Sequence, residues 1–321
     1  MAPIIKLVFI TAFIFSFSIA KATTWDEPWH NEVVKKADYF VLAKVIGNDS
    51  QKWVRIIILK QFGGKHLRDT ITITNFYLLS LCSYSSGEGP DFSFKNVDSC
   101  YFLIKTNAKN EYCIATPTAG YAILRYGKVH ATYRHSYHQA LVDPLIYENT
   151  MSAIFNNYHG LPYDKAYINN FVDKYLSLKP AGLGDSEIET FFNQHVALEC
   201  VYHLRLPNYY SKIISFLLDS SANFHSQISA ARALIAYNTA ESKQMLLKKI
   251  RDKKTIDFVK VMCIWTLADF KPKELKADLA KIEVTASEKE NGFGGDIMDP
   301  RVCTSLPTVK GAIKDLVAKL N

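Results

Sequence analysis

The chain has 321 residues, more than one typical domain needs, and 48% of them are hydrophobic, which is enough for a sizeable core. Its 38 basic and 31 acidic side chains give a formal charge of +7, and the two kinds are interleaved along the chain. Because no block of lysine or arginine forms a basic stripe, we expect the protein to bind no nucleic acid.

The first 22 residues have the pattern of a secretory signal peptide. Lys6 supplies a positive charge, an apolar run extends from Leu7 to Ala20, and Ala20-Lys21-Ala22 fits the small-x-small cleavage rule. The run is about 14 residues long, and a helix that crosses a bilayer needs ~20. We therefore expect cleavage after Ala22, a mature chain without a membrane span, and a periplasmic or extracellular location.

The stretch from Ala37 to Tyr133 has apolar residues with period two, which predicts β-strands separated by turns rich in Gly and Asn. No helical pattern of crossover length lies between the strands. So many short strands in about 100 residues favour an antiparallel barrel or sandwich. The predicted strands are 39–46, 53–59, 70–76, 101–105, 112–116, 121–125 and 128–133.

From Pro144 onward the apolar pattern becomes helical, and Lys179 to Gly184 is a linker rich in Pro and Gly. We therefore expect a two-domain α+β protein. Its predicted parts are a signal peptide (1–22), a β-barrel domain with a C-terminal helix (23–160), a helix and linker (161–184) and a helical-repeat domain (185–321).

The second half of the chain repeats itself. Segments 199–206, 230–237 and 263–270 superpose with offsets of 31 and 33 residues, and a second apolar helix pattern follows each segment. Such a repeat predicts helix pairs that stack and bury their apolar faces on one another. The predicted helices are 187–205, 208–219, 226–238, 240–251, 255–270 and 272–282, with a last one at about 306–320.

This half resembles HEAT and armadillo-like repeats, through its apolar pattern and the small residues Ala230, Ala231 and Ala233 of the clearest copy. The resemblance covers roughly a third of the chain. It implies an α-solenoid that offers a binding surface, and it specifies no ligand.

The first half is similar to OB barrels of the netrin-module and metalloproteinase-inhibitor type, through 37–45, the hairpin that follows, 101–104 and a trailing helix. Inhibitors of that family chelate the zinc of their target with an N-terminal cysteine. Here the mature chain is expected to begin at Thr23, and Cys82 is the first cysteine. The resemblance therefore implies an OB-like barrel without that inhibitory group.

Six cysteines follow the expected signal peptide. In an oxidising compartment Cys82, Cys100 and Cys113 are the candidates for disulfides, and a Cys82–Cys100 bridge would close a loop rich in Ser and Gly. Cys200 and Cys263 lie within apolar helix patterns, so we expect them to be buried thiols.

Three histidines within nine residues, His130, His135 and His138, are the candidate metal ligands, and zinc is the cofactor that they would hold. In a single strand His130 and His138 would share one face and His135 would point the other way. In a helix only His135 and His138 would be neighbours. The alternative is histidines at a strand end that bind no metal, and no other cofactor is expected.

None of the common catalytic motifs is present, and no loop has the pattern that cradles phosphates. Trp25 and Trp29 could anchor a partner or cover the mouth of the barrel. We expect an exported, non-enzymatic binding or scaffolding protein with a protein partner. The alternative is a metal-binding protein or metal-dependent hydrolase that uses the three histidines.

Overall fold

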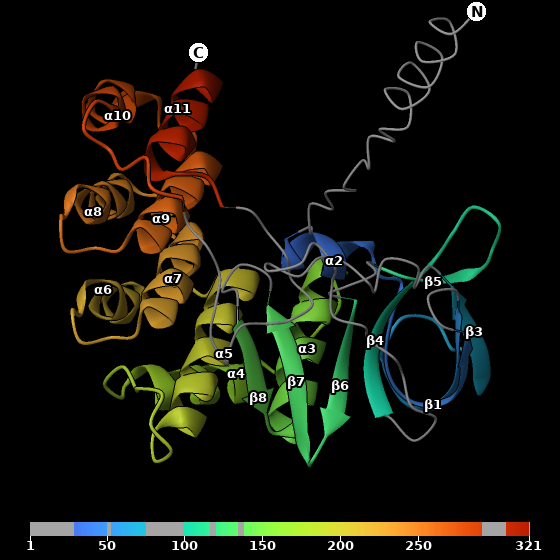
Figure 1. Ribbon diagram of the computed structural model, residues 1–321. Coiled ribbons are helices and arrows are strands. Elements are labelled where there is room, and N and C mark those ends of the chain that lie inside the picture. Colours follow the sequence, from blue (N-terminus) through green and yellow to red (C-terminus); the bar gives the residue numbers. More distant parts are fainter. Residues whose placement is uncertain are drawn as a thin grey trace, which may run out of the picture.

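The computed structural model describes residues 29–49, 53–74, 99–115, 120–133, 138–290 and 306–320. In this part of the chain an eight-stranded sheet is followed by a set of helices, so the protein is α+β (Figure 1). None of the helices within these ranges combines the length and the hydropathy that crossing a bilayer requires.

Five strands close into a barrel. Their order is β1-β2-β3-β5-β4, and β4 pairs again with β1. All these pairings are antiparallel except that of β3 with β5, which is parallel. The predicted barrel is therefore confirmed, with one parallel pair that the sequence did not indicate. The strands are β1 (Tyr39–Asp49), β2 (Trp53–Gly63), β3 (Thr70–Thr74), β4 (Ser99–Thr106) and β5 (Tyr112–Ile114).

Every second side chain along the strands points into the barrel and fills its interior. In β2 the side chains of Val54 and Ile56 are buried, and Arg55 and Ile57 are exposed, as the period of two requires. The interior residues form one apolar cluster, which includes Val41, Val45, Ile71, Ile73, Cys100, Phe102 and Ile104.

Strand β1 is longer than its sequence pattern suggests. Gly47, Asn48 and Asp49 have the composition of a turn, but they pair with Arg55, Val54 and Trp53 of β2. The register shifts between Val45 and Gly47, which is the local irregularity of a β-bulge. Residues 47–49 therefore belong to β1, so the predicted end of this strand at residue 46 is wrong.

Three further strands extend the sheet beyond the barrel in the order β4-β6-β7-β8. The predicted hairpin across Tyr126 and Gly127 is confirmed, and both turn residues have a positive φ, of 54° and 74°. Two-residue hairpin turns of this hand match the twist of their strands. The strands are β6 (Tyr121–Arg125), β7 (Lys128–Tyr133) and β8 (His138–Val142).

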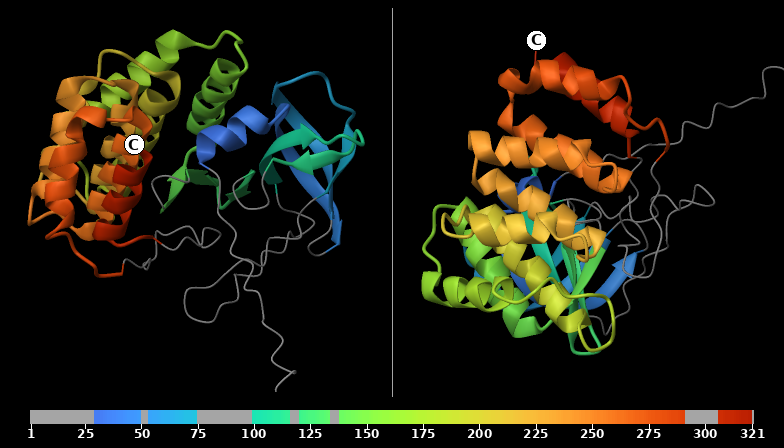
Figure 2. Two further views of the ribbon diagram at one scale, coloured as in Figure 1. Left: turned by 90° about the horizontal axis from the view of Figure 1, so that it is seen from above. Right: turned by 90° about the vertical axis from the view of Figure 1, so that its left-hand side faces the viewer.

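The helices after the sheet form two columns. The inner column is α5, α7, α9 and α11, and each of these packs on the next, with α6, α8 and α10 packed outside it (Figure 1). Figure 2 shows the layers following one another in chain order. The α-helices are α2 (His30–Lys36), α3 (Pro144–Tyr158), α4 (Lys165–Leu176), α5 (Ile188–Leu204), α6 (Tyr210–Leu218), α7 (Phe224–Ala233), α8 (Ala240–Arg251), α9 (Asp257–Phe270), α10 (Lys276–Glu283) and α11 (Val309–Lys319), with 3-10 turns at Leu234–Ala236 and Lys273–Leu275.

Side-chain caps begin several of these helices. The side chain of Asp143 accepts from the amide of Leu145 at α3, and Asp164 does the same for Tyr167 at α4. Each cap satisfies an amide that has no partner inside the helix. The predicted helix starts and ends in the repeat region agree with the structure to within a few residues.

Sheet and helices share one core. A single apolar cluster runs from α2 and the β6–β8 hairpins through α3 and the inner helices to α11. Glu148 also links α3 to the barrel. Its carboxylate accepts hydrogen bonds from Tyr101 Oη of β4 at 3.0 Å and from Lys60 Nζ of β2 at 2.6 Å. The domain boundary between 160 and 184 stays a prediction.

Candidate functional site

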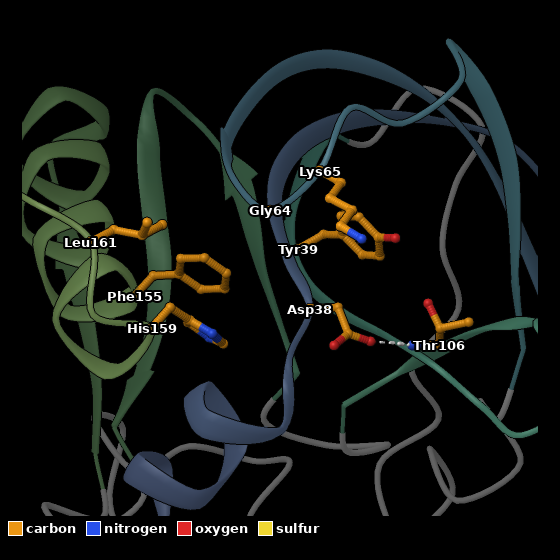
Figure 3. Close-up of a pocket in the computed structure, with 8 residues that line it drawn as sticks. All are labelled: Asp38, Tyr39, Gly64, Lys65, Thr106, Phe155, His159 and Leu161. Atoms are coloured by element: carbon orange, nitrogen blue, oxygen red, sulfur yellow. Dashed lines mark hydrogen bonds between the residues drawn. The ribbon is translucent and has the colours of Figure 1, made fainter.

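A cleft of about 550 Å³ separates one end of the barrel from the C-terminal end of α3 (Figure 3). Its volume lies in the range of small-ligand sites in proteins. The barrel wall comes from the start of β1, the loop after β2 and the end of β4. The lining residues are Asp38, Tyr39, Gly64, Lys65, Thr106, Phe155, His159 and Leu161.

The barrel wall of this cleft carries one acid and one base. The Asp38 carboxylate accepts a hydrogen bond from the backbone amide of Thr106 at 2.6 Å, which ties the start of β1 to the end of β4. Lys65 is exposed on the loop after β2. The wall therefore offers both a hydrogen-bond acceptor and a cationic donor to a ligand.

The helix wall is aromatic. The ring of His159 stacks on that of Phe155, with centroids 4.2 Å apart, and both point from α3 toward the barrel wall (Figure 3). Nε2 of His159 lies 3.3 Å from the carbonyl oxygen of Val34. A carbonyl can only accept, so this nitrogen donates the hydrogen bond.

Two glycines allow the chain to pass closely beside this cleft. Gly64 has a φ of +90°, and a Cβ there would lie 2.2 Å from the carbonyl oxygen of Asp38. A Cβ on Gly63 would lie 2.3 Å from the ring of Phe155. A residue with a side chain would therefore push β2 away from β1 and α3 and change the shape of the cleft.

A second cluster of titratable groups lies inside the protein, on α5. His195, Glu199 and His203 follow at four-residue spacing, so they share one face of the helix. His195 Nε2 lies 3.6 Å from Glu199 Oε1, and His203 Nε2 lies 3.4 Å from Glu199 Oε2. Burial raises the pKa of Glu199, and the hydrogen bond from His203 and the charge of Arg232 oppose that shift.

This network connects three further helices. His195 Nδ1 lies 2.8 Å from Ser229 Oγ on α7, and His203 Nδ1 lies 2.9 Å from the Tyr158 hydroxyl on α3. His203 Nε2 lies 3.3 Å from Nδ1 of His30 on α2. Buried polar groups of this kind are costly unless they are paired, so the network fixes how α2, α3, α5 and α7 lie together.

Ser229, His195 and Glu199 are the residue types of a hydrolytic triad, but the geometry does not favour hydrolysis. Ser229 is only 2% exposed and His195 3%, so the described residues shield the hydroxyl from solvent. The sequence signal for the network is His195-x3-Glu199-x3-His203. The stretch lies in the predicted helix 187–205, and its last residues belong to the repeat segment 199–206. The four-residue spacing of the three polar side chains, which that prediction leaves out, indicates a shared helix face.

The two candidate tryptophans differ in what the structure describes. Trp25 lies outside the described residues. Trp29 is half-buried, with its ring centroid 5.6 Å from that of Trp265, and the guanidinium of Arg232 lies 4.5 Å from the Trp29 ring. The Trp29 ring therefore packs within the chain.

Two of the three candidate zinc ligands lie on neighbouring antiparallel strands, His130 on β7 and His138 on β8, so the two do not belong to a single strand. His130 on β7 pairs with Leu141, and the backbone of His138 on β8 pairs with Tyr133. His135 lies outside the described residues. Among the described residues, no group of three His, Cys, Asp or Glu side chains has an arrangement that could hold a metal ion. The zinc site stays a prediction.

Four of the cysteines lie in the described residues. Cys100 and Cys113 are buried in the barrel, and Thr74 Oγ1 donates to the sulfur of Cys113 at 3.5 Å. Cys82 lies outside the described residues, so the Cys82–Cys100 bridge stays a prediction. Cys200 and Cys263 are buried thiols, as expected.

No protein-family model matches this chain, and neither a curated protein nor a solved structure is significantly similar to it.

Proposed function

We propose that this is an exported, non-enzymatic binding or scaffolding protein that acts through a helical-repeat surface and a β-barrel module. The stacking of α6 on α7, α8 on α9 and α10 on α11 supports a HEAT-like α-solenoid. The strand order β1-β2-β3-β5-β4, closed by β4 on β1, supports an OB-like barrel.

The cleft between barrel and α3 carries this proposal. It combines an acid, a base and three rings within about 550 Å³, and both parts of the fold contribute to its lining. Concave sites with aromatic walls and a few polar groups are typical binding sites. We infer a protein partner that inserts a loop or a chain end, since a cavity of this size also accommodates a few side chains.

The test is capture of partners by the mature chain under the conditions of the exported compartment. The bait variants are Lys65→Glu on the barrel wall and Leu161→Asp on the helix wall, because both side chains line the cleft and are exposed. The matched control is Lys44→Glu, an exposed lysine on β1 outside the cleft. We expect a partner that the wild type and the control enrich and that both cleft variants lose.

The same experiment can contradict the proposal. A wild-type chain that enriches no partner argues against a binding function. A partner retained by both cleft variants argues against the cleft as its site. Thermal unfolding of each variant separates loss of binding from loss of folding.

A further inference from the structure

A second cavity, of about 740 Å³, lies among the last helices of the stack. Four cationic side chains line it. Arg251 ends α8 and Lys253 follows it, Lys260 lies in the first turns of α9, and Lys281 lies on α10. The cavity therefore gathers positive charge from three consecutive helices of the repeat region.

Most of this charge is not neutralised within the described residues. Arg251 pairs with Asp278, with Nη2 to Oδ1 at 2.7 Å. In the described part of the chain no salt bridge pairs Lys253, Lys260 or Lys281, and no carboxylate is among the residues that line the cavity. Like charges that line one cavity without a carboxylate among them repel one another and attract anions.

The chemistry of the lining selects the kind of anion. Ammonium groups bind phosphate as point charges, and a guanidinium can bind it through two parallel hydrogen bonds. Ile282 and Val309 supply apolar surface beside the cations. The volume lies in the range of sites for compact ligands.

We propose that this cavity binds a compact ligand with several phosphate groups, which is either a free polyphosphate-like molecule or the headgroup of an anionic lipid. The inference deepens the proposed function and rests on it, because the cavity belongs to the proposed helical-repeat surface.

The test measures the binding of inorganic tripolyphosphate to the mature chain by calorimetry. The cavity variant is Lys253→Gln, Lys260→Gln and Lys281→Gln together. The matched control removes the same charge from exposed lysines elsewhere, as Lys44→Gln, Lys165→Gln and Lys174→Gln. We expect the cavity variant to lose at least about tenfold in affinity and the control to stay within about twofold of wild type.

Thermal unfolding adds a readout that a folding defect cannot imitate. Removing mutually repelling charges should leave the unfolding temperature of the free cavity variant equal to or higher than that of wild type. Tripolyphosphate should raise the unfolding temperature of wild type and control but not of the cavity variant. A wild type that binds no tripolyphosphate, or an equal loss in the cavity variant and the control, overturns the proposal.

Sedimentation with phosphatidylcholine vesicles, with and without a phosphatidylinositol bisphosphate, distinguishes the two sources of phosphate. Binding that needs the phosphoinositide and the three lysines, and that tripolyphosphate displaces, identifies a lipid headgroup. Tripolyphosphate binding without vesicle binding identifies a free ligand. Protein capture through the cleft is measured separately, so failure of the anion site and failure of the proposed function are distinguishable.

Discussion

Trp29 meets Trp265 edge-on, with ring centroids 5.6 Å apart and ring planes at 83°. Arg232 adds its guanidinium to the face of Trp29. Trp265 lies on α9 and Arg232 on α7. Trp29, which directly precedes α2, therefore packs against two layers of the helical stack. His30, the next residue, continues the connection to α5 through His203.

Replacing Trp29 by alanine should lower the free energy of unfolding by about 2 kcal/mol, since an aromatic pair, a cation–π contact and half-buried apolar area are lost together. Equilibrium unfolding in urea measures the effect. The control is Tyr126→Ala, because the Tyr126 side chain is 94% exposed at a hairpin turn and its loss should cost less than about 0.5 kcal/mol. Equal stabilities of the two variants would contradict the packing role of Trp29.

The Glu199→Gln variant should change how stability depends on pH. Burial raises the pKa of Glu199 above its ordinary value of 4.5, so the folded state favours the protonated carboxyl. The stability that this group contributes is therefore full below about pH 4.5 and is lost as the pH rises through the raised pKa. Glutamine cannot ionise, so the free energy of unfolding of the variant should increase relative to that of wild type as the pH rises.

Urea unfolding between pH 4 and pH 8 measures this gain, and each unit of pKa elevation corresponds to about 1.4 kcal/mol. The matched control is Glu189→Gln on the same helix, because the Glu189 side chain is 73% exposed. Its stability relative to wild type should stay nearly constant. A Glu199→Gln variant that only loses stability as the pH rises would show that the carboxylate is the form that the network favours.

Gly64→Ala should be far more costly than Gly127→Ala, although both glycines have a positive φ. A Cβ on Gly127 meets nothing within 4 Å, so that variant bears only the backbone strain, about 1 kcal/mol. A Cβ on Gly64 also clashes with the carbonyl oxygen of Asp38, and we expect a loss of about 3 kcal/mol or more. Thermal or urea unfolding of both variants gives the difference, and equal losses would exclude the clash.

The thiols of Cys200 and Cys263 should not react with alkylating reagents while the protein is folded. Burial raises the pKa of both, that of Cys263 to about 12, and the thiolate is the reactive form. Mass spectrometry after iodoacetamide treatment at pH 8, with and without denaturant, measures this. Both residues should be modified only in denaturant, and labelling of either one in the native protein would contradict their burial.

Much of the secondary structure could be predicted from the sequence, because hairpins and helices depend mainly on residues that are close together in the chain. The hairpin at Tyr126 and Gly127 and the helix at 240–251 lie where the periodicity puts them. The parallel pairing of Thr74 with Cys113 was not predictable in the same way. It joins strands whose contact depends on how the whole barrel closes, and no local signal records that.

The two candidate sites also differ in whether their residues are neighbours in the sequence. The cleft brings Asp38 beside Thr106 and places His159 opposite them, and these residues are far apart in the sequence. An isolated Asp, Thr or His in a sequence does not indicate that it lines a cavity. The α5 network differs, since His195, Glu199 and His203 lie within one helix and their spacing is visible in the sequence.

Strand β4 belongs both to the barrel and to the open sheet beyond it. One edge pairs with β1, and along the other edge Ser99 to Phe102 pair with β6 and Ile104 to Thr106 with β5. A fragment cut between β5 and β6 would leave half of that edge bare and prone to join the edges of other molecules. Cooperative melting of the two parts is the natural outcome of this shared strand, and shortened versions of the protein are best designed to keep β4 and β6 together.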